Sequence, residues 1–254
     1  MKPPVAFIDA DILLHRAVAF TDDEFDGEPM NDWKQALSNF EGILNNWMEG
    51  VGKVSDYYLV VSLDSNFRKD LYPDYKANRR DIVPHPAFAR LKEEVKTLQA
   101  TIWEEGIEAD DLIGLKVTSV PNSIAVSADK DFTTLPCKLF IPASHGKKKG
   151  EWFEFTEDEA NMNWLRQAMT GDTIDNYKGI PGIGPKKAEK IIPRPAPLDV
   201  MWGNVRRAFI ENNMTEADAI LMARLARILR AGDYDFEKKE VKLWNPTRKA
   251  GTSE

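Results

Sequence analysis

Residues 57–64 read YYLVVSLD, a run of apolar and β-forming residues that ends at Asp64. Similar short runs stand elsewhere in the chain: Val5–Ile8, ended by Asp9, Ser123–Ser127, followed by Asp129, and Lys138–Ile141. Short β-rich runs separated by helical stretches predict a mostly parallel sheet of the α/β class. Ligands of such sheets bind beyond the carboxyl ends of the strands. We therefore expect Asp9, Asp64 and Asp129 to share one edge of the sheet.

Helices are expected where apolar residues recur at helical spacing or where capping residues stand. The expected helices are 33–48, 86–100 with Leu98 on its apolar face, one opened by EADDLIGL at 108–115, one over Asn161–Met169 opened by Thr156 and Glu159, and one over 215–231 opened by Thr215 and Asp218. Asp11 fits the N-cap of the helix after the first strand. The proline-rich stretch 193–197 predicts a rigid connector.

Composition excludes several classes of protein. The 254 residues contain one cysteine, Cys137, and three histidines, His15, His85 and His145, which excludes a disulfide framework and a Cys/His zinc site. No apolar stretch reaches 18 residues and the N-terminus lacks a signal-peptide pattern. We expect a protein of the cytoplasm with no membrane partner.

The net charge of −7 is unevenly distributed. Residues 66–80 carry five Lys/Arg against two Asp, and residues 178–194 carry five against one Glu. Local basic segments permit binding to a polyanion despite the acidic total. The glycine-flanked run Lys147–Lys149 is interpreted as a flexible, solvated loop.

Clustered acids suggest a divalent-metal site, because carboxylates brought close together repel one another unless cations compensate them. Hard oxygen ligands suit Mg²⁺ or Mn²⁺. Each cluster alone has a simpler interpretation: helix N-terminal decoration for Glu108, Asp110 and Asp111, a turn for Asp129 and Asp131, and a cap for Asp172 and Asp175. The nine acids of the combined set are Asp9, Asp64, Glu108, Asp110, Asp111, Asp129, Asp131, Asp172 and Asp175.

Two segments carry nucleic-acid signals. The stretch GIPGIGPKKAEKII at 179–192 combines closely spaced glycines with a helix start and lysines, which is typical of a phosphate contact; a plain helix–turn–helix joint is the alternative. In FRKDLYPDYKANRR at 67–80, cations alternate with rings, as single-strand binding requires; a solvated basic loop is the alternative. The interval from Gly179 to Gly184 fits a Walker A motif, but Pro185 replaces the lysine, so a nucleotide cofactor is not expected.

Taken together, these segments resemble the 5′ nuclease superfamily: flap endonucleases, bacteriophage 5′–3′ exonucleases and the 5′-nuclease domain of bacterial DNA polymerase I. The motifs FIDAD, SLD, YPDYKANR, EADDLIG, SADKDF and GDTIDNYKGIPGIGPKKA stand in the family's order over roughly residues 5–192. The resemblance implies a PIN-like nuclease domain at 1–160, with a short arch near 66–100, and a helical DNA-binding domain of the helix–three-turn–helix type at 161–254 that contains the 178–192 hairpin.

The resemblance also implies roles for residues. The nine acids would bind two Mg²⁺ or Mn²⁺ ions, Lys76 and Arg79 would act at the scissile phosphate, and Gly182–Gly184 would contact duplex phosphates and hold one K⁺. The expected DNA contacts are Arg16, Arg68, Lys69, Tyr72, Tyr75, Arg80, Lys178, Gly182, Ile183, Gly184, Lys186 and Lys187. The implied substrate is DNA with a 5′ end or 5′ flap, including RNA-primed DNA, in replication or repair. The protein would act as a monomer, in the host cytoplasm if it is encoded by a phage.

Two other functions fit parts of the sequence. A PIN-domain ribonuclease would use a similar acid cluster but is not expected to carry the GIPGIG element. A non-catalytic helix-hairpin-helix module would retain the hairpin, although the complete set of acids disfavours an inert site. Only 44 positions separate Asp64 from Glu108, so the arch would be short, and threading of a flap through a closed arch is not expected.

Overall fold

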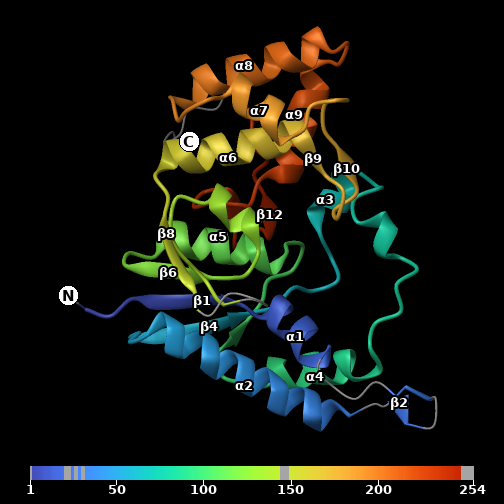
Figure 1. Cartoon of the computed structure of the whole chain (residues 1–254), viewed down its shortest axis with the longest axis vertical. Coiled ribbons are helices and arrows are strands. Elements are labelled where there is room, and N and C mark those ends of the chain that lie inside the picture. The colour runs from blue at the N-terminus through green and yellow to red at the C-terminus, as the bar shows by residue number, and fades with distance from the viewer. Residues whose placement is uncertain (1, 20–23, 26–27, 30–31, 144–148, 247–254) are drawn as a thin grey trace. The chain divides into compact units, whose positions relative to one another are not determined.

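The computed structural model describes residues 2–19, 24–25, 28–29, 32–143 and 149–246 (Figure 1). Chain contacts divide it into two compact units. Unit 1 comprises Met1–Ser65, Ile82–Phe132 and Cys137–Glu154, and unit 2 comprises Asn66–Asp81, Thr133–Pro136 and Phe155–Glu254. Lys147 and Lys148 of the predicted basic loop lie outside the described residues. No described helix is long and apolar enough to cross a membrane.

Unit 1 is an α/β layer structure. Its described elements are β1 (Val5–Asp9), α1 (Ala10–Val18), β2 (Glu24–Phe25), β3 (Glu28–Pro29), α2 (Trp33–Val51), β4 (Asp56–Val60), α4 (Pro86–Lys96), β5 (Thr101–Ile102), α5 (Ala109–Ser119), β6 (Ser123–Val126), β7 (Lys138–Ile141) and β8 (Glu151–Glu154). The 3₁₀ helix η2 (Lys130–Thr134) follows β6. The predicted runs and the predicted helices of this half are therefore present.

A six-stranded sheet forms the centre of unit 1, in the order β5-β4-β1-β6-β7-β8. All neighbouring pairs are parallel except β7 and β8, which are antiparallel. The predicted α/β class with a mostly parallel sheet is confirmed. Ile8 of β1 lies opposite Leu59 of β4 and Val126 of β6, so these strands end at the same edge.

Helices cover both faces of this sheet. Buried side chains of α1, α2 and α4 join Ala6 and Ile8 of β1 in one apolar cluster, whereas α5 lies on the opposite face (Figure 1). Alternate strand residues point to opposite faces, and Phe7 accordingly stacks on Tyr58 at 5.5 Å on the side away from that cluster. Helix α4 ends at Lys96, before the predicted 100, and Leu98 is 42% exposed rather than in the core.

Unit 2 is mainly helical. Its elements are α3 (Phe67–Leu71), the 3₁₀ helix η1 (Ala77–Arg79), α6 (Glu157–Thr170), β9 (Gly171–Asp172), β10 (Tyr177–Lys178), α7 (Pro185–Ile191), α8 (Leu198–Glu211), α9 (Glu216–Ala226), β11 (Tyr234–Asp235) and β12 (Glu240–Val241). The predicted capping boxes are confirmed: Thr156 with Glu159 opens α6, and Thr215 with Asp218 opens α9. Residues 193–197 connect α7 to α8 without regular structure, as predicted.

Helix α9 ends earlier than the sequence suggested. It was predicted to reach residue 231 but stops at Ala226, where Arg227 adopts an extended backbone. The carbonyls of Leu225 and Arg227 accept hydrogen bonds from the buried guanidinium of Arg68, at 3.0 and 2.6 Å. These donors satisfy carbonyls at the end of the helix.

Two glycines hold β9 and β10 against the end of α6. A Cβ atom at Gly171 would lie 2.2 Å from the backbone nitrogen of Gly179, and one at Gly179 would lie 2.2 Å from the carbonyl oxygen of Met169. Gly171 also has a φ of +70°, which favours glycine. Backbone therefore packs directly on backbone here, and this contact places the start of the hairpin.

The boundaries of the units differ from the predicted ones. The sequence suggested residues 1–160 and 161–254, with 66–100 as an arch of the first domain. The structure assigns Asn66–Asp81 and Thr133–Pro136 to unit 2 and ends unit 1 at Glu154. The reason lies in packing, because Tyr75 joins the apolar cluster of the helical unit, with Leu71 and Tyr72 packed against it.

Candidate functional site

Asp9 is the most constrained acid of unit 1. It is the last residue of β1 and is only 2% exposed. Its Oδ1 accepts a hydrogen bond from the backbone N–H of Ile12, so Asp9 is the N-cap of α1. The prediction that Asp11 caps this helix is wrong, because the helix already begins at Ala10 and Asp11 lies in its first turn.

Ser127 links the acids that follow β1 and β6. Its hydroxyl donates to Oδ2 of Asp9 at 2.7 Å and accepts from the backbone N–H of Asp129 at 3.0 Å. Oδ1 of Asp129 in turn accepts from the backbone N–H of Asp131 at 2.8 Å. The fully buried serine thus fixes one acid directly and the turn of two others through the backbone. This turn is the alternative that the sequence left open for Asp129 and Asp131.

Ser62 plays a parallel part beyond β4. Its backbone N–H donates to both carboxylate oxygens of Asp11, at 3.1 and 3.2 Å, and its hydroxyl accepts from the backbone N–H of Ala109 at 2.8 Å. Asp64 follows two residues later and is exposed. The chain of bonds from Asp11 to Ala109 therefore ties the segment that carries Asp64 to the start of α5.

Three acids open α5. Glu108 is the N-cap, and it forms a capping box with the fully buried Asp111, whose Oδ2 accepts from the backbone N–H of Glu108 at 3.2 Å. Asp110 lies in the same first turn and is half-buried. The hydrogen bonds of Glu108 and Asp111 are therefore those of an ordinary helix N-terminus, the simpler interpretation of this cluster. A metal ion at this edge would compete with backbone N–H donors for the oxygens of these two residues.

The electrostatics of the edge favour a cation. Burial, followed by the nearby charges of Asp11 and Asp129, raises the pKa of Asp9 to about 7, although hydrogen bonds from Ser127 and Ile12 act to lower it. A positive charge would stabilise the ionised form, and carboxylate oxygens are ligands for hard divalent ions. Within the described residues, no three His, Cys, Asp or Glu side chains already enclose a metal position. The metal-ligand roles of the nine acids thus stay a prediction.

Asp175 is the centre of a second polar cluster, which belongs to unit 2. Its carboxylate accepts from the hydroxyl of Tyr75 at 2.8 Å and from the guanidinium of Arg79 at 2.8 Å, and the ammonium of Lys76 lies 3.7 Å away. Both residues predicted to act at the scissile phosphate therefore contact the same acid, which is one of the predicted metal ligands.

Backbone contacts hold the YPDYKANR segment on the GDTIDN segment. The N–H of Lys76 donates to the carbonyl of Asp175 at 2.9 Å, and Lys76 adopts a left-handed backbone with φ 55°. The amide of Asn78 donates to the carbonyl of Thr173 at 3.2 Å, and that of Asn176 donates to the carbonyl of Asp74 at 2.7 Å.

Asp172, which is buried, makes the turn that presents Asp175. Its Oδ1 accepts from the backbone N–H groups of Ile174 and Asp175, at 2.7 and 3.2 Å.

The asparagines and serines that build both clusters were missed from the sequence. The available signal for Ser62 and Ser127 was a serine near the end of a strand, two residues before an acid.

Two predicted DNA contacts are corrected. Arg68 is 3% exposed and donates to carbonyls at the end of α9, so its role is structural. Tyr75 is also 3% exposed and stacks on Tyr177 at 6.4 Å, which prevents its ring from stacking on a base. In both cases the basic and aromatic pattern resembled a binding surface, but packing in unit 2 uses these side chains.

The other predicted DNA contacts outside the hairpin are accessible to different degrees. Lys69 and Arg80 are exposed, and Arg80 donates to the carbonyl of Pro73 at 3.0 Å. Tyr72 is half-buried against the helical core. Arg16 of unit 1 is half-buried, with its guanidinium 5.5 Å from the ring centre of Trp47.

The glycine-rich hairpin lies between β10 and α7, with its lysines on the surface. Lys178, Lys186 and Lys187 are exposed, and Ile183 is half-buried. Apart from the adjoining residues, no atom of the part of the chain that the structure describes lies within 4 Å of a Cβ built at Gly182 or Gly184, and the φ of Gly182 is +74°. Arg166 of α6 anchors α7 by donating to the carbonyl of Ile192 from Nε at 3.0 Å and from Nη2 at 2.6 Å. The hairpin therefore presents bare backbone beside cations.

The family model of the 5′–3′ exonuclease N-terminal, resolvase-like domain matches residues 4–161. The chain belongs to the 5′–3′ exonuclease family. The exonuclease of Escherichia phage T7 is 30% identical to this 5′ nuclease over 217 residues, 71% of each chain. Flap endonuclease Xni of Aeromonas salmonicida is 28% identical over 198 residues, 70% of this chain and 73% of that protein.

Solved structures agree on the fold of this 5′ nuclease. The crystal structure of the bacteriophage T5 flap endonuclease, a pseudo-enzyme–product complex with DNA and metal ions, has a TM-score of 0.55 at 16% identity and covers 87% of this chain and 98% of that one. The resemblance to 5′ nucleases is confirmed, and with it the class of activity. The protein is a 5′ nuclease, a hydrolase of phosphodiester bonds.

Proposed function

We propose that this 5′ nuclease hydrolyses DNA at 5′ ends or 5′ flaps, including RNA-primed DNA, with Mg²⁺ or Mn²⁺ bound by the acids at the carboxyl edge of the sheet. The observation that carries the proposal is Asp9: a buried carboxylate, fixed by Ser127 and Ile12, whose pKa is raised to about 7 by burial and by neighbouring acids. A bound cation would compensate the negative charge of this buried carboxylate and its neighbouring acids.

The ligands proposed in unit 1 are Asp9, Asp64, Glu108, Asp110, Asp111, Asp129 and Asp131, and those proposed in unit 2 are Asp172 and Asp175. A pair of bound ions would lower the pKa of the attacking water and stabilise the leaving oxygen. The protein's own share is positional: Ser127 and the α5 capping box hold the carboxylates in fixed orientations. Ligands that are already fixed need no reorganisation during the reaction. Electrostatic stabilisation of the transition state is effective for this reason.

Lys76 and Arg79 are proposed to offset the charge that develops on the phosphoryl oxygens. Both are cations held at one carboxylate, Asp175, with side chains 19% and 44% exposed. Arg79 can donate two parallel hydrogen bonds to a phosphate, whereas Lys76 acts as a point charge. The salt bridges keep the two cations near each other before substrate binds.

The hairpin is proposed to bind duplex phosphates, with a K⁺ ion at Gly182–Gly184 as a further expectation. Its support is the open space at Gly182 and Gly184 and the exposure of Lys178, Lys186 and Lys187. Gly184 offers a sharp test, because its φ of −96° suits any residue and no described residue beyond its neighbours crowds a Cβ built there. Gly184→Ala should leave thermal stability unchanged and weaken DNA binding. Unchanged binding would exclude a close approach of the DNA backbone.

The activity is tested with a 5′-flapped duplex labelled at the 5′ end, incubated with Mg²⁺ or with EDTA. Release of mononucleotides indicates exonuclease action, and release of the intact flap indicates cutting at the junction. No product in either case would overturn the proposal, and faster cleavage of a matched RNA would favour a PIN-type ribonuclease. Mn²⁺ in place of Mg²⁺ compares the two ions.

Separate variants distinguish chemistry from binding. Lys76→Ala should lower the single-turnover rate much more than it weakens DNA binding, because its cation acts on charge that appears in the transition state. Lys186→Ala should weaken binding and flatten its salt dependence while the single-turnover rate at saturating DNA stays unchanged. Equal losses of rate and binding in the Lys76 variant would contradict its role.

A further inference from the structure

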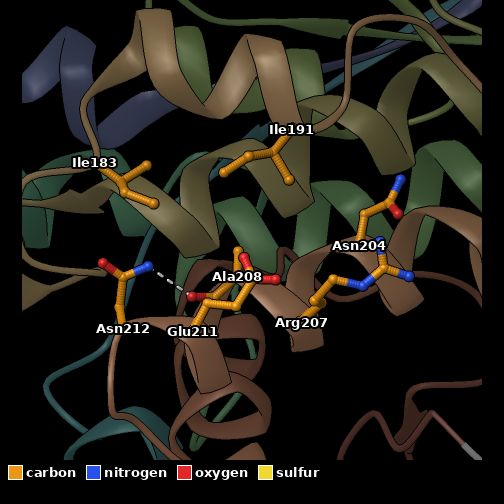
Figure 2. Close-up of a pocket in the computed structure, with 7 residues that line it drawn as sticks. All are labelled: Ile183, Ile191, Asn204, Arg207, Ala208, Glu211 and Asn212. Carbon is orange, nitrogen blue, oxygen red and sulfur yellow. Dashed lines mark hydrogen bonds between the residues drawn. The ribbon is translucent and has the colours of Figure 1, made fainter.

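A pocket of about 380 Å³ lies within unit 2, beside the hairpin (Figure 2). Ile183 of the hairpin and Ile191, the last residue of α7, form one wall. Residues of α8 and the position after it form the other wall: Asn204, Arg207, Ala208, Glu211 and Asn212. The pocket therefore joins the proposed duplex contact to a helix that the sequence motifs did not include.

Donors and acceptors occupy opposite ends of the α8 wall. Asn204 and Arg207 stand three apart on the helix, so they share a face, and they provide amide and guanidinium donors. Glu211 follows one turn later, and Asn212 donates its amide to the carbonyl of Ala208 at 2.8 Å, which leaves its own oxygen as an acceptor (Figure 2). The donor end suits a phosphate, and the acceptor end repels one.

Ile183 makes the pocket continuous with the hairpin, because it stands between the two open glycines, Gly182 and Gly184. A DNA strand carries a phosphate about every 3.4 Å along the helix axis, so a strand held at the hairpin presents further phosphates on each side. The exposed Arg207 stands across the pocket from Ile183.

We propose that Arg207, assisted by Asn204, is a second phosphate-binding site that takes the next phosphates of the DNA strand held by the hairpin. The inference rests on the proposed duplex binding by the hairpin and extends it to α8. Glu211 limits the contact to the Asn204–Arg207 end of the pocket, because a phosphate at the other end would meet a carboxylate.

The chain contains a matched control for Arg207. Arg206 is its neighbour on α8, carries the same charge and is also exposed. It does not line the pocket, and its Nε lies 3.0 Å from Oε2 of Glu216 on α9. Arg206→Ala and Arg207→Ala therefore change the net charge equally, and only the second removes a donor from the pocket.

The experiment measures binding of a fluorescent 5′-flapped duplex to the full chain in EDTA, at salt concentrations from 50 to 200 mM. Arg207→Ala should reduce the slope of log affinity against log salt by about 0.9, with a loss on the order of tenfold at 50 mM that narrows to about threefold at 200 mM. Arg206→Ala should keep the wild-type slope. Glu211→Gln should bind more tightly than the wild type.

A second measurement locates the contact on the DNA. Neutral methylphosphonates are placed one at a time along the DNA strand. At the positions next to the hairpin contact, each should weaken DNA binding by the wild type and leave DNA binding by Arg207→Ala unchanged. Equal slopes for the Arg206 and Arg207 variants, or methylphosphonate effects that persist in Arg207→Ala, would overturn the inference. If Gly184→Ala and Lys186→Ala still weaken binding in that case, hairpin binding stands and only the α8 contact fails.

Discussion

At the scale of single residues, Ser127 orders the acids at the carboxyl edge of the sheet. Its hydroxyl lies between the carboxylate of Asp9 and the N–H of Asp129. Ser127→Ala should lower cleavage about 10- to 100-fold and raise the Mg²⁺ concentration needed for half-maximal rate, because partners that orient metal ligands typically contribute that much. Single-turnover rates across a Mg²⁺ titration measure both effects.

Ser123 provides the control for this prediction. It is buried at the opposite end of the same strand, β6, and its hydroxyl donates to the carbonyl of Val120 at 2.7 Å. Ser123→Ala should lose a similar stability, about 1 kcal/mol, without a change in Mg²⁺ requirement. A shift of the Mg²⁺ requirement in both variants, or in neither, would show that Ser127 matters only for folding.

Arg68 and its neighbour Lys69 separate a structural cation from a surface one. Arg68→Ala should lower the free energy of unfolding by about 3 kcal/mol, because buried carbonyls at the end of α9 lose charged donors. Lys69→Ala should leave stability unchanged and weaken DNA binding. Denaturant unfolding and the salt dependence of binding check the pair, and a flatter salt slope for folded Arg68→Ala would restore its predicted DNA contact.

The burial of Arg68 shows what local sequence does not contain. FRKDLYPDYKANRR has the composition of a nucleic-acid surface, and Lys69 and Arg80 are indeed exposed. Arg68 is instead 3% exposed because a carbonyl-rich helix end, 157 residues away in sequence, is packed against it. Such a partner is visible only in the folded chain. The same contact explains why α9 ends at Ala226, whereas its apolar spacing continued further.

At the scale of secondary-structure elements, substitution of two glycines of one hairpin by alanine should affect stability very differently. Gly179→Ala would place a Cβ 2.2 Å from the carbonyl oxygen of Met169, which neither backbone can avoid. We expect a loss of about 3 kcal/mol or more in unfolding free energy and, in folded protein, weaker DNA binding. Gly184→Ala, by contrast, should match the wild-type midpoint in the same urea titration. A neutral Gly179→Ala would mean that β9 and β10 are not held by this contact.

Strands and helix starts could be predicted because their signals are local. Each strand of the sheet that was expected is a short apolar run, and Thr156 and Thr215 each stand three residues before an acid. The bonding of the acids could not be predicted in the same way. Whether Glu108 and Asp111 face an ion or close a capping box depends on which donors the fold brings near them.

At the scale of the whole molecule, the surplus of acids should make stability depend on magnesium. The net charge is −7, and Asp9 is buried close to Asp11 and Asp129. Mg²⁺ at 100 times its dissociation constant should raise the unfolding free energy by about 2.7 kcal/mol, because it binds only the folded state. Thermal denaturation with MgCl₂, against NaCl of equal ionic strength, measures the effect. Asp9→Asn should show a smaller gain, and equal gains in both salts would indicate screening instead of binding.

The salt bridges of Asp175 have a consequence for selectivity. Lys76 and Arg79 share the single carboxylate of Asp175 in the free protein, which offsets part of their positive charge. An arbitrary polyanion that touches this loop competes with that carboxylate for the two cations, so non-specific electrostatic binding gains less from them. A substrate anchored elsewhere at the same time can compensate for the exchange. The loop thereby discriminates against loosely held competitors before any bond is broken.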